Sequence, residues 1–248
     1  MKALLAKIGR GIRKAFVPTV VALTVALTIA HFAWKYSGSN EWELVKDQEG
    51  VKVYTLKTPG STLLKVKADM QVATSLTSAV FLLRGDESTS DDFGGQDFTV
   101  VERIETPKLF MATYAAKHPM PPPFRTKEMV VMLNYAQDKA TKRVEINVQA
   151  APGRTPPSPN TSRVTHLNNI FRLTPLPDGL IDWEITLDVD MGLFYPLANL
   201  SMPEYLFKDL SYHKTLVLTE KYQKARLVSI EEPGDAAPAL ASSLQETL

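Results

Sequence analysis

Residues 180–191 read LIDWEITLDVDM and carry four carboxylates, on Asp182, Glu184, Asp188 and Asp190. Closely spaced carboxylates can bind a metal ion or act as a general acid and base. Successive side chains of a strand point to opposite faces, so these carboxylates would share one face and apolar residues the other. Neighbours on one face lie roughly 6.5 Å apart, too far for two of them to bind one ion unaided. The pattern therefore favours a solvated outer face.

A charged pair, Lys127 and Glu128, begins a second apolar strand pattern. Adjacent strand residues point to opposite faces, so at most one of these two side chains can reach the protein interior. A charge buried there would need a partner from another strand, because an isolated buried ion is costly. We treat Lys127 and Glu128 as a candidate polar pair of a ligand pocket.

Other signatures of catalysis are absent from the sequence. The chain lacks the short motifs of serine hydrolases, zinc peptidases and nucleotide-binding loops, and its four histidines are isolated from one another. It has no cysteine, which excludes disulfides, thiolate nucleophiles and Cys-ligated zinc. The acidic stretch 86–97 lacks the spacing of an EF-hand and is expected to be a solvated loop. We predict no catalytic residue, no metal site and no cofactor.

The elements that would position these residues are mostly strands. The segments 51–57 and 63–70 flank the turn signal TPGS and predict a hairpin. A helix follows at 73–83, with Thr74 as its cap. Further strands are expected at 97–105, 109–116, 128–137, 143–150, 163–175 and 180–191, with a Pro-rich loop at 152–161.

A last helical pattern begins at Pro203 and continues to Leu227. Proline suits the first turn of a helix. An apolar stripe along this helix comprises Leu206, Leu210, His213 and Val217. Six consecutive antiparallel strands curl as they twist, and one long helix can lie across their concave face. The sequence therefore predicts an α+β fold, in which the apolar row of 180–191 faces inward. His213 is expected to be a hydrogen-bonded core histidine, with a general base as the alternative.

The ends of the chain differ from the middle. Residues 15–34 have no charged side chain and match the ~20 residues that a helix needs to cross a bilayer. Five basic residues in 1–14 favour a cytoplasmic N-terminus. We interpret 15–34 as a transmembrane anchor and 35–40 as a flexible linker, which places the remaining chain on the extracytoplasmic side, in the periplasm of a bacterium. The alternative is a cleaved signal peptide and a secreted or periplasmic protein.

The chain as a whole is nearly neutral, with 28 basic and 27 acidic residues. A balanced domain offers no electrostatic surface for nucleic acid, so we expect no nucleic-acid partner. Residues 229–248 have no aromatic residue and little periodicity, and we predict a disordered tail there.

Residues 41–228 resemble the START family of lipid-transfer domains, within the helix-grip superfamily. The resemblance rests on EWELVKDQEGVKVY, KHPMPPPFRTKEMVVMLNY, NNIFRLTPLPDGLIDWEITLDVDMGLFYPLANL and the final helix. In the family the strand after the Pro-rich approach usually begins with Arg-Asp, where this chain has Lys127-Glu128, which keeps the charges but lacks the planar guanidinium. The resemblance implies a helix-grip fold: a curved antiparallel β-sheet wrapped around a long C-terminal helix, enclosing a hydrophobic tunnel.

The expected ligand contacts lie on two strands, before the final helix and on that helix: Met129, Val131, Leu133, Ile181, Trp183, Ile185, Leu187, Phe194, Leu206 and Leu210. Plain core packing is the alternative for Trp183 and for the two helix leucines. The segment 192–205 is expected to connect strand and helix, and its apolar residues are interrupted by Gly and Pro. Two interpretations of this segment stay open: it touches the bilayer and admits the ligand, or its side chains simply cap the core.

We therefore expect a membrane-tethered, non-enzymatic protein that binds a sterol, a phospholipid or a similar hydrophobic molecule and presents or transfers it. Its expected partners are this lipid and the membrane. Two other functions stay open. One is a helix-grip enzyme of the cyclase or aromatase type that acts on a hydrophobic substrate, and the other is an accessory protein with a filled pocket that works through its surface.

Overall fold

The computed structural model describes residues 2–85, 96–106 and 109–234, with side chains from Phe16 onward. Most of the predicted acidic loop at 86–97 lies outside these residues. The chain divides into two compact units, Met1–Trp42 with Leu56–Leu64, and Glu43–Thr55 with Lys65–Leu248. Each unit is described by itself.

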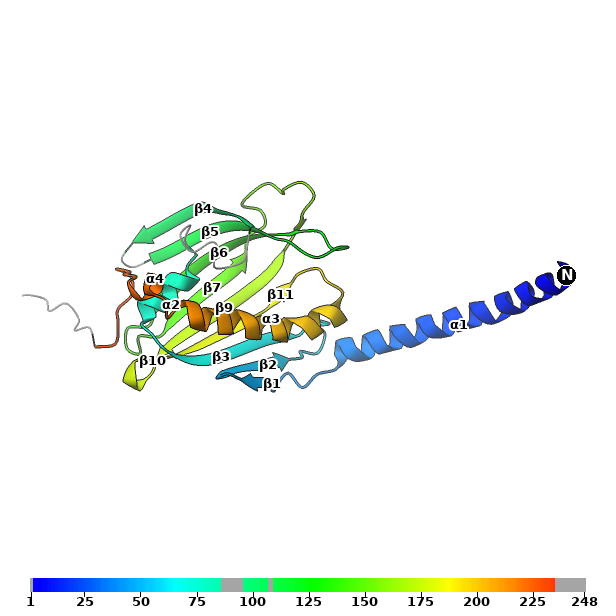
Figure 1. Cartoon of the computed structure of the whole chain (residues 1–248), viewed down its shortest axis with the longest axis horizontal. Helices are drawn as coiled ribbons and strands as arrows, with labels where there is room; N and C mark the ends of the chain where they lie inside the picture. Colours follow the sequence, from blue (N-terminus) through cyan, green and yellow to red (C-terminus); the bar gives the residue numbers. More distant parts are fainter. Residues whose placement is uncertain (1, 86–95, 107–108, 235–248) are drawn as a thin grey trace, which may run out of the picture. The chain divides into compact units, whose positions relative to one another are not determined.

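The first unit contains the helix α1 (Lys2–Tyr36) (Figure 1). The 21 residues Phe16–Tyr36 of this helix are long and apolar enough to cross a membrane, and the most apolar part of them is not buried against the rest of the protein. Membrane anchors and signal sequences share this property. The end of α1 is bonded to the loop 57–64. Trp34 Nε1 donates to the Thr62 carbonyl at 2.8 Å, and the Gly60 amide donates to the Lys35 carbonyl at 2.8 Å. The first two residues of the predicted flexible linker 35–40, Lys35 and Tyr36, thus belong to the end of α1.

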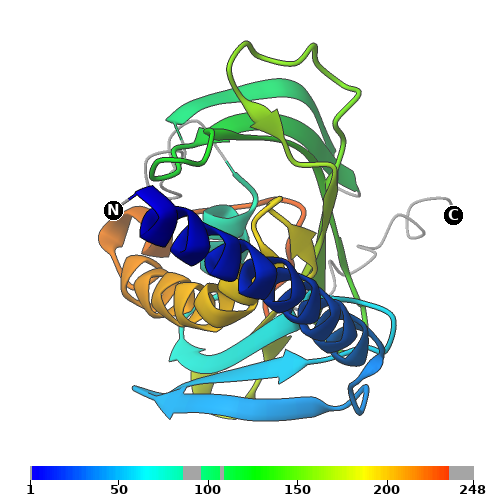
Figure 2. The same cartoon turned by 90° about the vertical axis from the view of Figure 1, so that its right-hand side faces the viewer.

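The second unit is built on a curved sheet whose main strands follow the order β1-β2-β3-β10-β9-β7-β6-β5-β4. Figure 2 shows the curvature, with the C-terminal helix on the concave side. The strands are β1 (Trp42–Gln48), β2 (Val51–Leu56), β3 (Lys65–Ala73), β4 (Gln96–Thr106), β5 (Leu109–His118), β6 (Lys127–Gln137), β7 (Val144–Ala150), β8 (Ser162–Arg163), β9 (His166–Pro175), β10 (Leu180–Leu187) and β11 (Val189–Asp190). The short β8 runs parallel to β6, and β11 pairs with β9. The predicted α+β helix-grip architecture is confirmed, with β1 as an added strand.

The strand β10 has the predicted alternation. Its inward side chains Ile181, Trp183, Ile185 and Leu187 are buried, whereas Asp182 and Glu184 are half-buried on the other face. The predicted single strand 180–191 is interrupted at Asp188. The Asp188 carboxylate binds Lys65 Nζ and His166 Nε2, each at 2.8 Å, which holds the chain at this break.

The helix α2 (Leu76–Leu83) begins later than predicted. Ser75, and not Thr74, is its N-cap, and the Ser75 side chain accepts a hydrogen bond from the Ser78 amide at 3.0 Å. The Glu232 carboxylate accepts the amides of residues 76 and 77 at 3.0 and 2.7 Å, a favourable place for a negative charge. The predicted tail therefore starts with residues that are bonded to the domain: Tyr135 Oη, for example, lies 2.6 Å from Ser229 Oγ.

The helix α3 (Tyr195–Leu216) begins eight residues before the predicted start at Pro203, and a separate short helix α4 (Glu220–Gln223) follows it. The predicted start was wrong because Pro196 occupies the first turn, where its missing amide is harmless, and α3 accommodates Pro203 in its interior. The predicted connector 192–205 is therefore mostly helix. The expected stripe is confirmed: Leu206, Leu210, His213 and Val217 are all buried.

Candidate functional site

The inner side of the sheet is not uniformly covered. On β3 and β10 it is buried, and α3 packs against β3. We call this region the covered inner face. It comprises Val66, Ala68, Met70, Val72, Ile181, Trp183, Ile185 and Leu187. A side chain in such a position already has its full set of packing partners, so this region is core.

A second region of the same side remains half-buried. Val131 on β6 pairs with Tyr114 and Ala150 in the register of the sheet, and it packs at the margin of the core. Alternation places Met129 on the same side of β6. Val148 on β7 and Phe171 on β9 also lie at this margin. We call Met129, Val131, Val148 and Phe171 the open inner face. It is an apolar, concave surface that the described part of the chain does not cover completely.

Lys127 lies at one end of the open inner face. It alternates with Met129 and Val131 along β6, so it points to the same side of the sheet. Only 5% of the residue is exposed, and its ammonium donates to Ser162 Oγ at 3.4 Å. His118 is opposite Lys127 in the register of β5 and β6, and burial lowers the pKa of the His118 imidazole below its usual value. The open inner face thus ends in a basic, partly desolvated corner.

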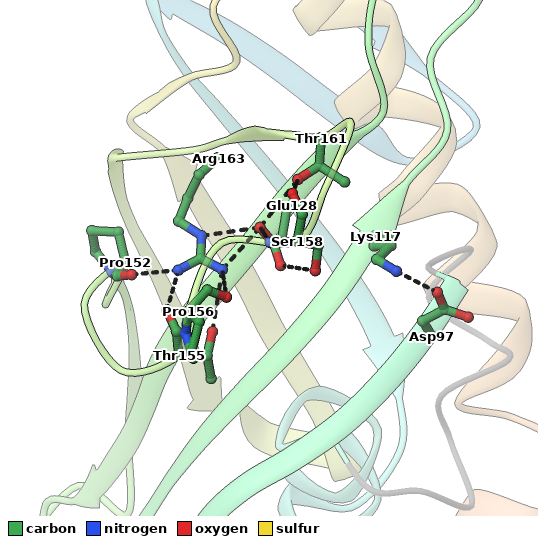
Figure 3. Close-up of polar contacts among 9 residues, drawn as sticks. All are labelled: Asp97, Lys117, Glu128, Pro152, Thr155, Pro156, Ser158, Thr161 and Arg163. Atoms are coloured by element: carbon green, nitrogen blue, oxygen red, sulfur yellow. Dashed lines mark hydrogen bonds and ion pairs between the residues drawn. The ribbon is translucent and has the colours of Figure 1, made fainter.

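Glu128 belongs to the other side of the sheet, where it pairs with Arg163 (Figure 3). Arg163 Nη2 lies 2.9 Å from Glu128 Oε2, and Ser158 Oγ donates to Glu128 Oε1 at 2.6 Å. Burial alone raises the pKa of Glu128, but the hydrogen bonds from Ser158 and Arg163 and the charge of Arg163 outweigh it and lower this pKa to about 2. Glu128 is therefore ionised and fully engaged.

The Arg163 guanidinium also fastens the Pro-rich loop 152–161. It donates to the carbonyl oxygens of Pro152 at 2.6 Å and Pro156 at 2.8 Å, as Figure 3 shows. Five guanidinium N–H groups in a planar fork suit this task. The Glu128–Arg163 pair thus organises a loop on the outer side of the sheet, and Lys127 is the member of the candidate pair that lies on the inner side.

Comparisons of the fold with solved structures give consistent results, whereas no protein-family model and no curated protein matches the sequence. A STAR-related lipid transfer protein from Xanthomonas axonopodis matches with a TM-score of 0.65 at 20% identity, covering 72% of this chain and 99% of that one. The chain has the fold of START lipid-transfer domains.

Two human structures agree. The lipid transfer and protein localization domain of StarD13 matches with a TM-score of 0.63 at 10% identity, over 79% of this chain and 97% of that one. StAR-related lipid transfer protein 5 matches with a TM-score of 0.57 at 13% identity, over 84% and 97%. Identities this low establish the fold and leave the ligand undefined.

Within this START fold the predicted contact residues separate into three groups. Leu133, Leu206 and Leu210 are buried in the core, together with the predicted β10 residues of the covered inner face. Met129 and Val131 lie on the open inner face. Phe194, by contrast, is 70% exposed just before α3. Sequence reasoning missed Val148 and Phe171, although the alternation of their strands gave a signal for both.

The buried histidine of the START fold belongs to the covered region. His213 on α3 is 3% exposed and stacks on Trp183, with 6.1 Å between ring centroids and 21° between planes. Its Nδ1 lies 3.7 Å from the Asp209 carboxylate. Within residues 16–85, 96–106 and 109–234, no group of three His, Asp or Glu side chains could hold a metal ion. His213 therefore forms part of the core packing.

The loop before α3 adjoins the basic corner. A Cβ added to Gly192 would lie 3.3 Å from Lys127 Nζ, and the φ of Gly192 is +63°, a conformation that favours glycine. Immediately beyond, Phe194, Leu197 and Leu200 are 70%, 42% and 79% exposed. The end of the START fold that holds Lys127 thus carries an exposed apolar segment at the beginning of α3.

Proposed function

We propose that this chain is a membrane-tethered START-like protein that binds a hydrophobic molecule on its open inner face and presents or transfers it. The observation that carries the proposal is the half-buried state of four large apolar side chains on the concave side of the sheet. Fully burying an exposed side chain of this size contributes about 1.5–3 kcal/mol, and a half-buried one retains part of this gain, so an apolar ligand that covers several of them would bind favourably. The similar structures named above are lipid-transfer domains, which supports binding without catalysis.

Two contacts orient β1 and α3 within the second unit. Lys46 on β1 pairs with Glu204 at 2.6 Å, and three residues later the Glu49 carbonyl accepts from Lys214 Nζ at 2.9 Å. The earlier residue of the β1 segment contacts the earlier residue of α3, and the later residue contacts the later one. The two elements therefore run in the same direction and begin at the same end of the second unit.

An uncleaved α1 would tether the second unit to a membrane, and the exposed apolar residues at the start of α3 are suited to contact a lipid surface. Phe194, Leu197 and Leu200 would enter the interfacial region there, and a lipophilic ligand would reach the open inner face from the membrane at high effective concentration. A tethered domain cannot carry lipid freely through water. It would extract a lipid and present it, or pass it across a short gap on the extracytoplasmic side.

Native mass spectrometry tests this proposal on the full chain purified from its own host. We expect one hydrophobic molecule bound to each chain, and an intact mass that includes α1. A chain that carries no hydrophobic molecule, and that takes up none from mixed phospholipid vesicles, would contradict lipid binding. An intact mass that lacks α1 would contradict tethering and support a cleaved signal peptide.

A further inference from the structure

A buried ammonium without a carboxylate partner is the feature of this site that most needs a counter-ion. Lys127 is 5% exposed, and among the described residues its polar partner is a hydroxyl, Ser162 Oγ, at 3.4 Å. No carboxylate of the described chain lies within ion-pair distance of its Nζ. Burying a charge in this way is costly unless an opposite charge arrives.

The nearest acid in sequence cannot supply this counter-ion. Glu128 follows Lys127 directly, but it points to the other side of β6 and is occupied by Arg163 and Ser158. The Asp190 carboxylate accepts the amide of Gly192 at 2.7 Å and lies beyond ion-pair distance of Lys127. The neighbouring His118 is a base, and the lowered pKa leaves its imidazole neutral at pH 7.

The position of Lys127 relates its charge to the ligand surface. Its Nζ lies beside Gly192, in the loop before α3, while Met129 and Val131 continue the same side of β6 away from it. The site therefore presents a cation at one end and an apolar surface along its length. This is the complement of an amphiphile that has one acidic group and a hydrocarbon chain.

We propose that Lys127 binds the anionic head group, a carboxylate or a phosphate, of an amphiphile whose hydrocarbon chain covers the open inner face. This inference rests on the proposed function and narrows its ligand to acidic amphiphiles. His118 is placed to add a hydrogen bond to the same head group. Hydrogen bonds to charged groups are among the stronger ones in proteins, so the head group contributes both affinity and orientation.

Photo-cross-linking of the full chain in phosphatidylcholine nanodiscs tests this assignment. The probes are a fatty acid with a diazirine on its chain, the methyl ester of that acid, and a monoalkyl phosphate with the same chain. Intact mass spectrometry measures the labelled fraction. We expect the acid, the phosphate or both to label the protein at least about tenfold more than the ester, and the two acidic arms identify which head group is preferred.

The variants locate the effect. We expect Lys127→Met to reduce acid labelling to the level of the ester and Lys127→Arg to retain it. Lys139→Met, at an exposed turn, should leave labelling unchanged. The melting temperature of Lys127→Met should not fall, because the variant removes a buried charge; a lower value would instead indicate a structural lysine and overturn the inference.

The outcomes also separate this inference from the proposed function. Equal labelling by acid and ester, or undiminished acid labelling of Lys127→Met, would overturn the role of Lys127 and leave hydrophobic binding intact. Labelling by none of the three probes would contradict lipid binding itself.

Discussion

The covered and the open inner face are built from the same kind of residue on neighbouring strands, yet only one of them is core. Ile185 and Phe171 are direct partners between β10 and β9. Ile185 is 2% exposed, whereas Phe171 is half-buried. Along β7 the same change occurs between Ile146, which is fully buried, and Val148. The packing of helices on the concave side, α3 against β3 and α2 against β9, and not the apolar character of a strand, therefore decides which inward residues are buried.

The largest expected effect is a loss of stability from a substitution in the covered inner face. Trp183→Asp would bury a charge without a partner among tightly packed side chains, and we expect a loss of at least about 4 kcal/mol of unfolding free energy. Val131→Asp on the open inner face should leave the chain folded, because its carboxylate can remain in contact with water. Urea unfolding followed by tryptophan fluorescence for Val131→Asp, and limited proteolysis for both variants, would measure the difference.

A control on β10 sharpens this prediction. Asp182→Ala should change stability by no more than about 0.5 kcal/mol, because burial, with nearby Asp69 and Glu184, already raises the pKa of Asp182 and disfavours its charge. Equal stability of Trp183→Asp and Val131→Asp would show that the two faces do not differ in packing.

The next effect concerns the outer side of β6. The folded-state pKa of Glu128 is about 2, below its usual 4.5, so the Glu128–Arg163 pair stabilises the fold above pH 4.5 and loses this contribution as the pH falls toward 2. The shift corresponds to about 3 kcal/mol. Glu128→Gln should remove that part of the pH dependence in acid unfolding experiments, and it should leave lipid binding at pH 7 unchanged if the variant is folded. If Glu128→Gln unfolds in acid with the same pH dependence as the wild-type protein, the Glu128–Arg163 pair does not stabilise the fold in this way.

The smallest expected effect concerns the membrane. Leu200→Ser removes an exposed apolar contact at the start of α3, and we expect a few-fold slower uptake of lipid from vesicles with unchanged stability. Tyr212→Ser, also exposed but near the other end of α3, is the matched control. Hydrogen exchange of residues 192–200 should slow when vesicles are added. Equal uptake by both variants would place the entry route elsewhere.

Much of this fold is readable in the sequence because strand alternation is a local property. The acid and apolar residues of β10 separate as their spacing requires, and the stripe of α3 follows the helical period. The start of α3 was harder to predict from the sequence, since both Pro196 and Pro203 are acceptable in the first turn of a helix. The strand β1 is exposed almost throughout, so its sequence shows no buried face.

The candidate site was only partly predictable. Alternation assigns Val131 to one side of β6, but nothing local reveals which inward residues α3 covers, because that depends on where a helix some seventy residues later crosses the sheet. Arg163 falls in the predicted strand 163–175, but the pattern gave no sign that it belongs to a separate two-residue strand or that it pairs with Glu128. Tertiary placement, and not local periodicity, decides both cases.

The most direct test of the account is a pair of substitutions at adjacent positions of β6. Val131 and Met132 are both half-buried but point to opposite sides of the sheet. Native mass spectrometry of Val131→Trp and Met132→Trp, each prepared as the full chain from its own host, compares their bound lipid. We predict that Val131→Trp folds and loses the hydrophobic molecule, because the indole fills the open inner face, while Met132→Trp keeps it. Full occupancy in Val131→Trp, or loss in Met132→Trp alone, would contradict the account.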